Sequence, residues 1–321
     1  MKRCAVLDDY QGVALASADW SALDGRVEVR TIRERLADQD AVVAAVGDCE
    51  ILVVMRERTP LDAALLARLP RLELVVTSGM RNASIDLAAA RARGVTVCGT
   101  DSGSTPPTEL TWALLLGLAR QTHVESRAMR DGGPWQSTVG ADLAGRTLGL
   151  VGLGKIGGRV ARVGLAFGMD VVAWSPHLTD ARAAEHGVRR AAELPELLAA
   201  ADFVSVHLVL SDRTRGLLGE RELRAMRPDA YLVNTSRAGL VDGPALLRAL
   251  REGWIAGAGL DVYETEPLPA DDPLRTLPNV LALPHLGYVS RANYARYFGG
   301  AVEDIAGWLD GTPVRELALP A

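Results

Sequence analysis

The stretch LGLVGLGKIG, residues 148–157, carries most of the information about the fold of this chain. Its first four residues form an apolar run typical of a buried strand, and Gly152, Gly154 and Gly157 follow at once. A strand that leads through such glycines into a helix is typical of a dinucleotide site. The glycines allow a tight turn, close approach of backbone to pyrophosphate, and close helix–strand packing. The stretch therefore predicts a cofactor loop, with a plain tight turn as the alternative.

Short apolar runs alternate with helix-like segments on both sides of this loop. The predicted strands are residues 4–7, 27–31, 50–55, 72–77, 95–98, 147–151, 170–174, 203–208, 230–234, 255–261 and 280–283. The predicted helices are residues 37–46, 60–69, 84–93, 108–130, 158–168 and 291–309. Such alternation predicts parallel sheets wrapped by helices, that is, an α/β fold.

Two series of strands and helices are separated by residues 99–107, which are rich in Gly, Ser and Pro and predict a hinge or linker. A chain of 321 residues is long for one hydrophobic core, so two domains are expected. We therefore predict two doubly wound parallel-sheet domains.

Composition narrows the class of protein. A hydrophobic content of 48% indicates a globular chain, and a net charge of -5 argues against a nucleic-acid partner. No uncharged run approaches the ~20 residues of a membrane span, and Asp8 and Asp9 interrupt the first apolar stretch too early for a signal peptide. The three cysteines are widely spaced and form no CxxC, so we expect no disulfide, no metal site and a cytoplasmic protein.

The choice between NAD and NADP is left open by the strand that follows the glycine loop. An acidic residue at the end of this strand would hold the adenosine ribose of NAD. Ser175 occupies that place, whereas Asp170 stands at the other end of the strand and Asp180 lies beyond a proline. No Arg or Lys follows directly to bind a 2′-phosphate. We expect NAD as the cofactor and do not exclude NADP.

Polar residues follow three later strands. Arg237, Glu266 and His285 each come shortly after a predicted strand, and the carboxyl ends of parallel strands meet at one edge of a sheet. A guanidinium can bind a carboxylate and polarise a carbonyl group. An imidazole, with a reference pKa of about 6.5, can give and take a proton, and a neighbouring carboxylate favours its charged form.

The three side chains together predict reduction of a charged keto acid by hydride transfer. Each also has a structural alternative. Arg237 could form a surface ion pair, Glu266 could be a turn residue, and His285 could fill a domain junction.

At these residues the chain resembles the D-isomer-specific 2-hydroxyacid dehydrogenase family. The resemblance is carried by four motifs: the glycine run at 152–157, NTSRAGLVD at 234–242, GLDVYETEP at 259–267, and the Pro-His pair at 284–285. It covers nearly the whole chain. The family's architecture implies a Rossmann-type NAD(P)-binding domain, residues 99–285, inserted in a flavodoxin-like substrate domain made of residues 1–98 and 286–321.

The resemblance implies the following site. Arg237, Glu266 and His285 are the catalytic residues of an NAD(P)-dependent D-2-hydroxyacid dehydrogenase, or equally a reductase of glyoxylate, hydroxypyruvate or a similar small keto acid. Cofactor contacts are expected at Gly152, Gly154, Lys155, Ile156, Gly157, Ser175, Leu208, Val209, Thr214, Thr235, Ser236, Arg237, Asp261, His285 and Gly287. Asp261 could instead only brace the site.

The substrate carboxylate is expected, by the same resemblance, on a loop of the outer domain, TSGMRNASID at 77–86. The expected substrate contacts are Arg56, Ser78, Gly79, Met80, Arg81 and Arg237. Arg81 stands where a second glycine is common in the family, so it could favour an extra anionic group or could point into solvent. The family also implies a homodimer, with Trp135 in the contact.

Two other functions stay open. One is an NADH-sensing, corepressor-like interaction protein that has kept the fold and lost turnover. The other is a formate- or phosphite-type dehydrogenase on the same scaffold.

Overall fold

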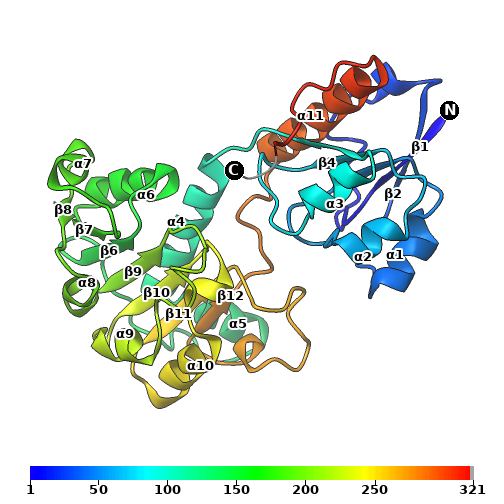
Figure 1. Cartoon of the computed structure of the whole chain (residues 1–321). Coiled ribbons are helices and arrows are strands. Elements are labelled where there is room, and N and C mark those ends of the chain that lie inside the picture. Colours follow the sequence, from blue (N-terminus) through cyan, green and yellow to red (C-terminus); the bar gives the residue numbers. More distant parts are fainter. Residues whose placement is uncertain (319–321) are drawn as a thin grey trace. The chain divides into compact units, whose positions relative to one another are not determined.

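The computed structural model in Figure 1 describes residues 1–318. The chain divides into two compact units. Unit 1 comprises Met1–Gly103 together with the described residues from Val289 on, and unit 2 comprises Ser104–Tyr288. The divisions fall a few residues beyond the boundaries expected from the sequence, and unit 2 is an insertion between the two parts of unit 1.

Unit 1 is built on a five-stranded parallel sheet with the strand order β2-β1-β3-β4-β5. Its strands are β1 (Lys2–Val6), β2 (Val27–Thr31), β3 (Ile51–Val54), β4 (Leu74–Thr77) and β5 (Thr96–Gly99). Its helices are η1 (Ser21–Leu23), α1 (Gln39–Val46), α2 (Ala63–Ala67), α3 (Leu87–Ala92) and α11 (Arg291–Leu309). The order is that of flavodoxin-like sheets, as predicted.

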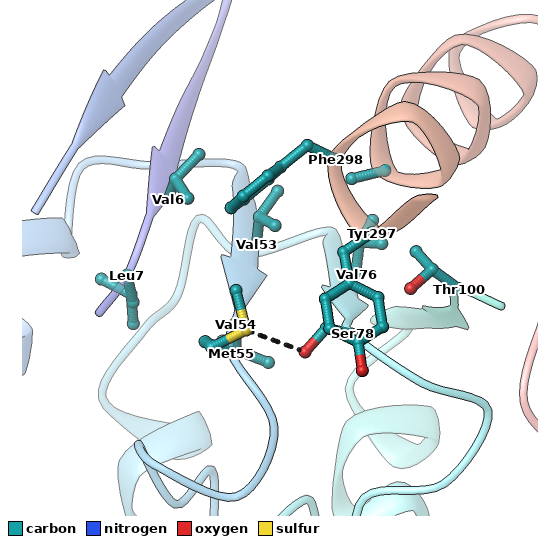
Figure 2. Close-up of a pocket in the computed structure, with 11 residues that line it drawn as sticks. Val6, Leu7, Val53, Val54, Met55, Val76, Ser78, Thr100, Tyr297 and Phe298 are labelled. Atoms are coloured by element: carbon teal, nitrogen blue, oxygen red, sulfur yellow. Dashed lines mark hydrogen bonds between the residues drawn. The ribbon is translucent and has the colours of Figure 1, made fainter. Parts of the chain in front are cut away.

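Both faces of this sheet are covered by helices (Figure 1). Helices α1, α2 and α3 pack on one face, where Ala5, Leu52 and Val75 form the core. Successive side chains of a strand point to opposite sides of the sheet, so the alternate side chains face the other way. Helix α11 covers this other face (Figure 1). A cavity of ≈ 10 Å³ lies there, with room for about one water molecule. Its lining includes Val6, Val53 and residues of α11 (Figure 2).

Unit 2 is built on a seven-stranded parallel sheet with the strand order β12-β11-β10-β9-β6-β7-β8. Its strands are β6 (Thr147–Val151), β7 (Asp170–Trp174), β8 (Arg189–Arg190), β9 (Phe203–Val206), β10 (Tyr231–Asn234), β11 (Gly257–Leu260) and β12 (Val280–Ala282). Its helices are α4 (Thr105–Ala119), α5 (Thr122–Arg130), α6 (Lys155–Ala166), α7 (Asp180–Glu185), α8 (Leu194–Ala200), α9 (Glu220–Ala225), η2 (Ala238–Leu240), α10 (Gly243–Glu252) and η3 (Pro273–Arg275).

The strand order of unit 2 is that of a Rossmann sheet with one added strand, so the predicted fold class is confirmed for both units. Helices α4 and α6 bury one face of the sheet, and α8, α9 and α10 bury the other (Figure 1). From β6 the next strands, β7 and β8, are added on one side of the sheet, and β9 to β12 are added on the other. The order of the strands thus reverses at β6 and β9, which lie side by side. Ligands of open α/β sheets bind at the carboxyl ends of strands at such a switch point.

Three expectations about secondary structure are corrected. The single helix predicted at 108–130 is two helices, α4 and α5, because Gln121 adopts a left-handed backbone (φ 52°) between them and its side chain bonds Tyr231 Oη at 2.7 Å. Helix α4 also begins earlier than predicted, since prolines are tolerated in a first turn. Strand β8 was not predicted because two exposed arginines at a sheet edge leave no apolar pattern.

Three further observations concern residues 1–318 as a whole. Cys4, Cys49 and Cys98 are buried free thiols. No group of three or more His, Cys, Asp or Glu side chains in the described part of the chain could hold a metal ion. None of the described helices combines the length and apolar character needed to cross a membrane.

Candidate active site

The glycine run lies where β6 passes into α6. Gly152 has φ 111°, and a Cβ atom there would lie 2.7 Å from the carbonyl oxygen of His207. A Cβ atom at Gly157 would lie 2.2 Å from the oxygen of Gly152, so only glycine fits either position. Gly154, the N-cap of α6, has no atom within 4 Å of its would-be Cβ. The open backbone at a helix N-terminus fits a pyrophosphate, which the N–H groups can bind.

Lys155 and Ile156 form the first turn of α6, and Ser175 follows the end of β7 as predicted. The turn after β7 is closed by the Leu178 N–H, which donates to Ser175 O at 3.1 Å. The Arg190 side chain donates to Leu178 O at 2.8 Å. Ser175 is therefore placed at the strand end next to the glycine loop, where the second strand of a Rossmann sheet meets the adenosine ribose.

The loop after β9 contains Leu208, Val209 and Thr214. The Thr214 hydroxyl donates to Val209 O at 2.8 Å and accepts from the Ser211 N–H at 2.8 Å. It therefore orders the loop itself. Beneath the glycine run, His207 Nε2 lies 2.9 Å from Ser205 Oγ, and burial lowers the pKa of His207 to about 4. This imidazole is neutral at physiological pH and serves as a packing wall for the loop.

The turn after β10 is held by its own polar side chains. Asn234 Oδ1 accepts from the Ser236 N–H at 3.0 Å, and its Nδ2 donates to Arg237 O at 2.9 Å. The Ser236 hydroxyl donates to Val206 O at 3.0 Å, which ties β10 to β9. Thr235 Oγ1 lies 2.9 Å from Thr111 Oγ1 on α4. The backbone that carries Arg237 is thereby fixed at the carboxyl edge of the sheet.

Glu266 and His285 form a direct pair. His285 Nδ1 lies 2.6 Å from Glu266 Oε2, and the two side chains are only 18% and 28% exposed. The second carboxylate oxygen, Oε1, accepts from the Tyr263 N–H at 3.0 Å. The Tyr288 ring packs edge-on against the His285 ring, with 5.4 Å between centroids. The Nδ1 contact orients the imidazole, and its Nε2 is then the nitrogen that can exchange a proton with a substrate.

The backbone of His285 is strained. Its φ of 54° lies in the left-handed region, which costs a non-glycine residue about 1–3 kcal/mol. Asp261, fully buried, holds the backbone that follows: its two oxygens accept from the Leu286 N–H and the Gly287 N–H, each at 2.7 Å.

Asp261 is costly to keep ionised. Burial raises its pKa from 3.8 to about 6, even though the two amides and the His285 side chain work in the opposite direction. A carboxyl group of this kind is half ionised at about pH 6 and becomes almost fully charged about one pH unit higher. The clamp on the backbone after His285 is therefore strongest at neutral pH and above.

Among the predicted residues of unit 2, hydrogen bonds pair Glu266 with His285 and Asp261 with Gly287. Arg237 follows β10, which pairs with β11, so it lies at the end of the adjacent strand. Its Nη1 donates to Ser236 O at 2.8 Å. Arg237, Asp261, Glu266 and His285 thus follow three neighbouring strands of one parallel sheet.

The predicted substrate loop lies in unit 1, at the carboxyl ends of β3 and β4. The Arg56 N–H donates to Ser78 Oγ at 2.9 Å, and Arg56 has φ 54°. A Cβ atom at Gly79, whose φ is 94°, would lie 2.4 Å from the Arg56 guanidinium. Arg56, Ser78 and Gly79 are therefore in contact, whereas Met80 and Arg81 are exposed.

Sequence reasoning missed three positioning side chains. Asn234 shapes the turn before Arg237, and Asn82 plays a similar part in unit 1, where its amide donates to Arg56 O at 2.5 Å. An Asn just before or within a polar turn is a recognisable signal for such bonds. Tyr263 is the third. Its hydroxyl contacts the main-chain oxygens of Leu260 and Leu283, and no sequence pattern indicates such contacts.

A doubly wound sheet with a glycine loop at its switch point defines a dinucleotide-binding protein. The family model described as the NAD binding domain of D-isomer specific 2-hydroxyacid dehydrogenases matches residues 112–287. A glyoxylate reductase from Korarchaeum cryptofilum is 38% identical over 289 residues, which are 88% of this chain and 83% of the relative. A D-3-phosphoglycerate dehydrogenase from Mycobacterium tuberculosis is 40% identical over 276 residues, 85% of this chain; the chain spans about half of that relative, 51%.

Solved structures agree over nearly the whole chain. A phosphoglycerate oxidoreductase from Vibrio cholerae superposes with a TM-score of 0.93 and 38% identity, covering 97% of this chain and 100% of that one. For a putative D-3-phosphoglycerate dehydrogenase from Ralstonia solanacearum the TM-score is 0.94 at 36% identity, with 99% and 97% covered. The chain belongs to the D-isomer-specific 2-hydroxyacid dehydrogenase family. It is an NAD-dependent oxidoreductase that acts on a CH–OH group.

Proposed function

We propose that this D-2-hydroxyacid dehydrogenase interconverts a small 2-keto acid, such as glyoxylate or hydroxypyruvate, and the corresponding D-2-hydroxy acid, with His285 as the acid and base. The observation that carries the proposal is the 2.6 Å contact between His285 Nδ1 and Glu266 Oε2. An imidazole held in this way, at the same carboxyl edge of the sheet as a dinucleotide loop, is equipped for proton transfer. The similarity to a glyoxylate reductase and a D-3-phosphoglycerate dehydrogenase supports the substrate class.

The proposed roles follow from the contacts. When bound, NADH supplies the hydride that reduces the keto carbon. His285 donates the proton from Nε2 to the carbonyl oxygen, and it takes the proton back in the direction of oxidation. Glu266 stabilises the charged imidazole through Nδ1. Arg237, whose guanidinium stays charged, binds the substrate carboxylate and polarises the carbonyl group.

We also propose that Arg56, Ser78, Gly79, Met80 and Arg81 select the anionic group of the substrate. Arg56 and Gly79 are fixed by neighbouring groups, whereas Arg81 is exposed. The glycine-run residues, with Ser175, Leu208, Val209, Thr214, Thr235 and Ser236, are proposed to line the cofactor. NADP remains a proposed second cofactor because Ser175 carries no negative charge to repel a 2′-phosphate.

The decisive experiment follows absorbance at 340 nm. The protein is mixed with NADH or NADPH and, separately, with glyoxylate, hydroxypyruvate, its 3-phospho derivative and pyruvate. Oxidation of formate with NAD⁺ is measured in parallel. We expect turnover with at least one keto acid. Tight NADH binding without turnover of any substrate would favour the NADH-sensing interaction protein. Oxidation of formate alone would favour the formate-type dehydrogenase.

A homodimer is the proposed assembly. Trp135, Met129 and Val139 are 77%, 66% and 99% exposed in and after α5, which is a large apolar exposure for a protein surface. Analytical ultracentrifugation of the intact chain checks the assembly directly. A single species with the 34.2 kDa mass of one chain would exclude it.

A further inference from the structure

Tyr263 lies between the ends of β11 and β12, and the proposed mechanism gives it no role. Its hydroxyl is 3.0 Å from Leu260 O and 2.9 Å from Leu283 O. Leu260 is the last residue of β11, and Leu283 follows the last residue of β12. A phenol carries one proton, so the two contacts are branches of one three-centre hydrogen bond that ties the ends of the two strands together.

The two carbonyl groups also hold the chain that leads to His285. Leu260 O accepts from the Leu283 N–H at 2.8 Å, and Leu283 O accepts from the His285 N–H at 3.1 Å. The second of these bonds closes a tight turn immediately before the left-handed His285. The Tyr263 hydroxyl therefore fixes the carbonyl group on which this turn depends.

The same residue acts on the other member of the pair. The Tyr263 N–H donates to Glu266 Oε1, while Glu266 Oε2 contacts His285. The main chain of Tyr263 therefore bonds Glu266, which orients the imidazole of His285. Its side chain bonds the carbonyl groups that hold the backbone leading to His285. Asp261 holds the backbone on the far side of His285. Together these contacts oppose the strain at His285 from both directions.

From this geometry we propose that Tyr263 is a positioning residue of the reaction, whose hydroxyl keeps the His285 ring in register with Glu266. The inference rests on the proposed role of His285. Burial raises the pKa of the Tyr263 phenol far above its usual value, so the hydroxyl remains a donor over the whole working range of pH. The ring itself packs against the core between the sheet and its helices. Removal of the oxygen alone should leave that packing in place.

The test is Tyr263→Phe, with Tyr231→Phe as the matched control. Tyr231 belongs to the same sheet, and its hydroxyl also takes part in a hydrogen bond, which it accepts from Gln121 Nε2. It is the first residue of β10, at the opposite end of the strand from Arg237. We expect Tyr263→Phe to lower kcat for keto-acid reduction about 5–50-fold, which is part of the ~10²–10⁴-fold that acid–base catalysis contributes. The KM for NADH should stay within about two-fold, and the control should retain the wild-type kcat.

Two readouts separate positioning from a merely structural role. The pH profile of kcat should move to lower pH in Tyr263→Phe, because a displaced imidazolium is less well stabilised by Glu266. The ¹H–¹⁵N signal of His285 Nδ1–H should exchange with water faster in Tyr263→Phe than in wild type or Tyr231→Phe. This second readout needs no turnover, so it still judges the inference if the protein reduces no keto acid and the proposed function fails.

A Tyr263→Phe variant with the wild-type pH profile and Nδ1–H exchange would overturn the inference, whatever its melting temperature. A variant that fails to fold would overturn it too. The hydroxyl would then be needed for folding of the sheet rather than for positioning His285 against Glu266. Equal losses in Tyr263→Phe and Tyr231→Phe would likewise assign the effect to general stability.

Discussion

The two sheets each place a non-glycine residue with a left-handed backbone at their carboxyl edge, and they hold it by different chemistry. In unit 2, His285 has φ 54° and is held by the ionisable Asp261 and by Tyr263. In unit 1, Arg56 also has φ 54°, but its partners are the Ser78 hydroxyl and the Asn82 amide.

The difference matches the proposed division of tasks, in which unit 2 transfers the proton and unit 1 binds the substrate. A clamp made of a carboxylate responds to pH, and it surrounds a side chain that is proposed to move a proton. A clamp made of neutral groups holds its geometry at any pH, which suits a side chain that needs only to present a positive charge. We therefore expect substitutions in unit 2 to change kcat and its pH dependence, and substitutions in unit 1 to change KM alone.

The largest effect is expected for His285→Ala. Loss of the acid and base should reduce kcat about 10²–10⁴-fold, whereas NADH affinity measured by fluorescence titration should be unchanged. The proposed pyrophosphate site is the glycine run after β6, whereas His285 follows β12, which is the reason for the split. Wild-type turnover by this variant would show that His285 is not the acid and base. The assignment of proton transfer to unit 2 would then be wrong.

Asp261→Asn should come next, with kcat reduced about 10–100-fold because a carboxamide has one oxygen for the two amides of Leu286 and Gly287. The pKa of about 6 adds a pH signature. As pH falls through 6, Asp261 takes up a proton and the clamp weakens, so wild-type kcat should fall. In Asp261→Asn this acid limb should disappear.

Stability should move in the opposite direction over the same range. The pKa of Asp261 is raised on folding, so the folded protein binds the proton more tightly than the unfolded chain, and its ionisation costs stability between about pH 4 and 6. The cost is about 3 kcal/mol when ionisation is complete. Chemical denaturation of wild type should therefore show stability rising, relative to Asp261→Asn, as pH falls from 6 to 4.

Asp304→Asn is the matched control for this prediction. Asp304 lies in α11 of unit 1, is fully buried, and burial raises its pKa to about 6 as well. Its replacement should alter the pH dependence of stability in the same sense without removing the acid limb of kcat. Loss of that limb in Asp304→Asn would show that it reports folding rather than the clamp.

The smallest effect is expected for Ser78→Ala. Without the hydroxyl, the Arg56 N–H loses its acceptor, and the KM for the keto acid should rise about 3–10-fold with kcat within about two-fold. The rise should be the same at pH 6 and pH 8, because neither Ser78 nor Asn82 titrates. A change in the pH profile of kcat would contradict the separation between the units.

Much of the fold followed from patterns within short stretches. The apolar runs that became β6, β7 and β2 have the bounds that the sequence predicted, and α11 has its predicted bounds too. The order of polar residues after β10, β11 and β12 located the candidate site, because adjacent parallel strands end at one edge. The break at Gln121 had no local signal, since its side chain bonds Tyr231 on a distant strand.

The sequence by itself determined the two sheets, the glycine loop, the family, and which residues stand at the ends of which strands. Only the tertiary structure showed that Asp261 holds the amides of Leu286 and Gly287, and that the Tyr263 hydroxyl lies between the carbonyls of Leu260 and Leu283. The physical reason is that these side chains bind main-chain groups. Every residue carries a carbonyl group, so the identity of the partner leaves no trace in the sequence, and only the folded chain decides which ones come within reach.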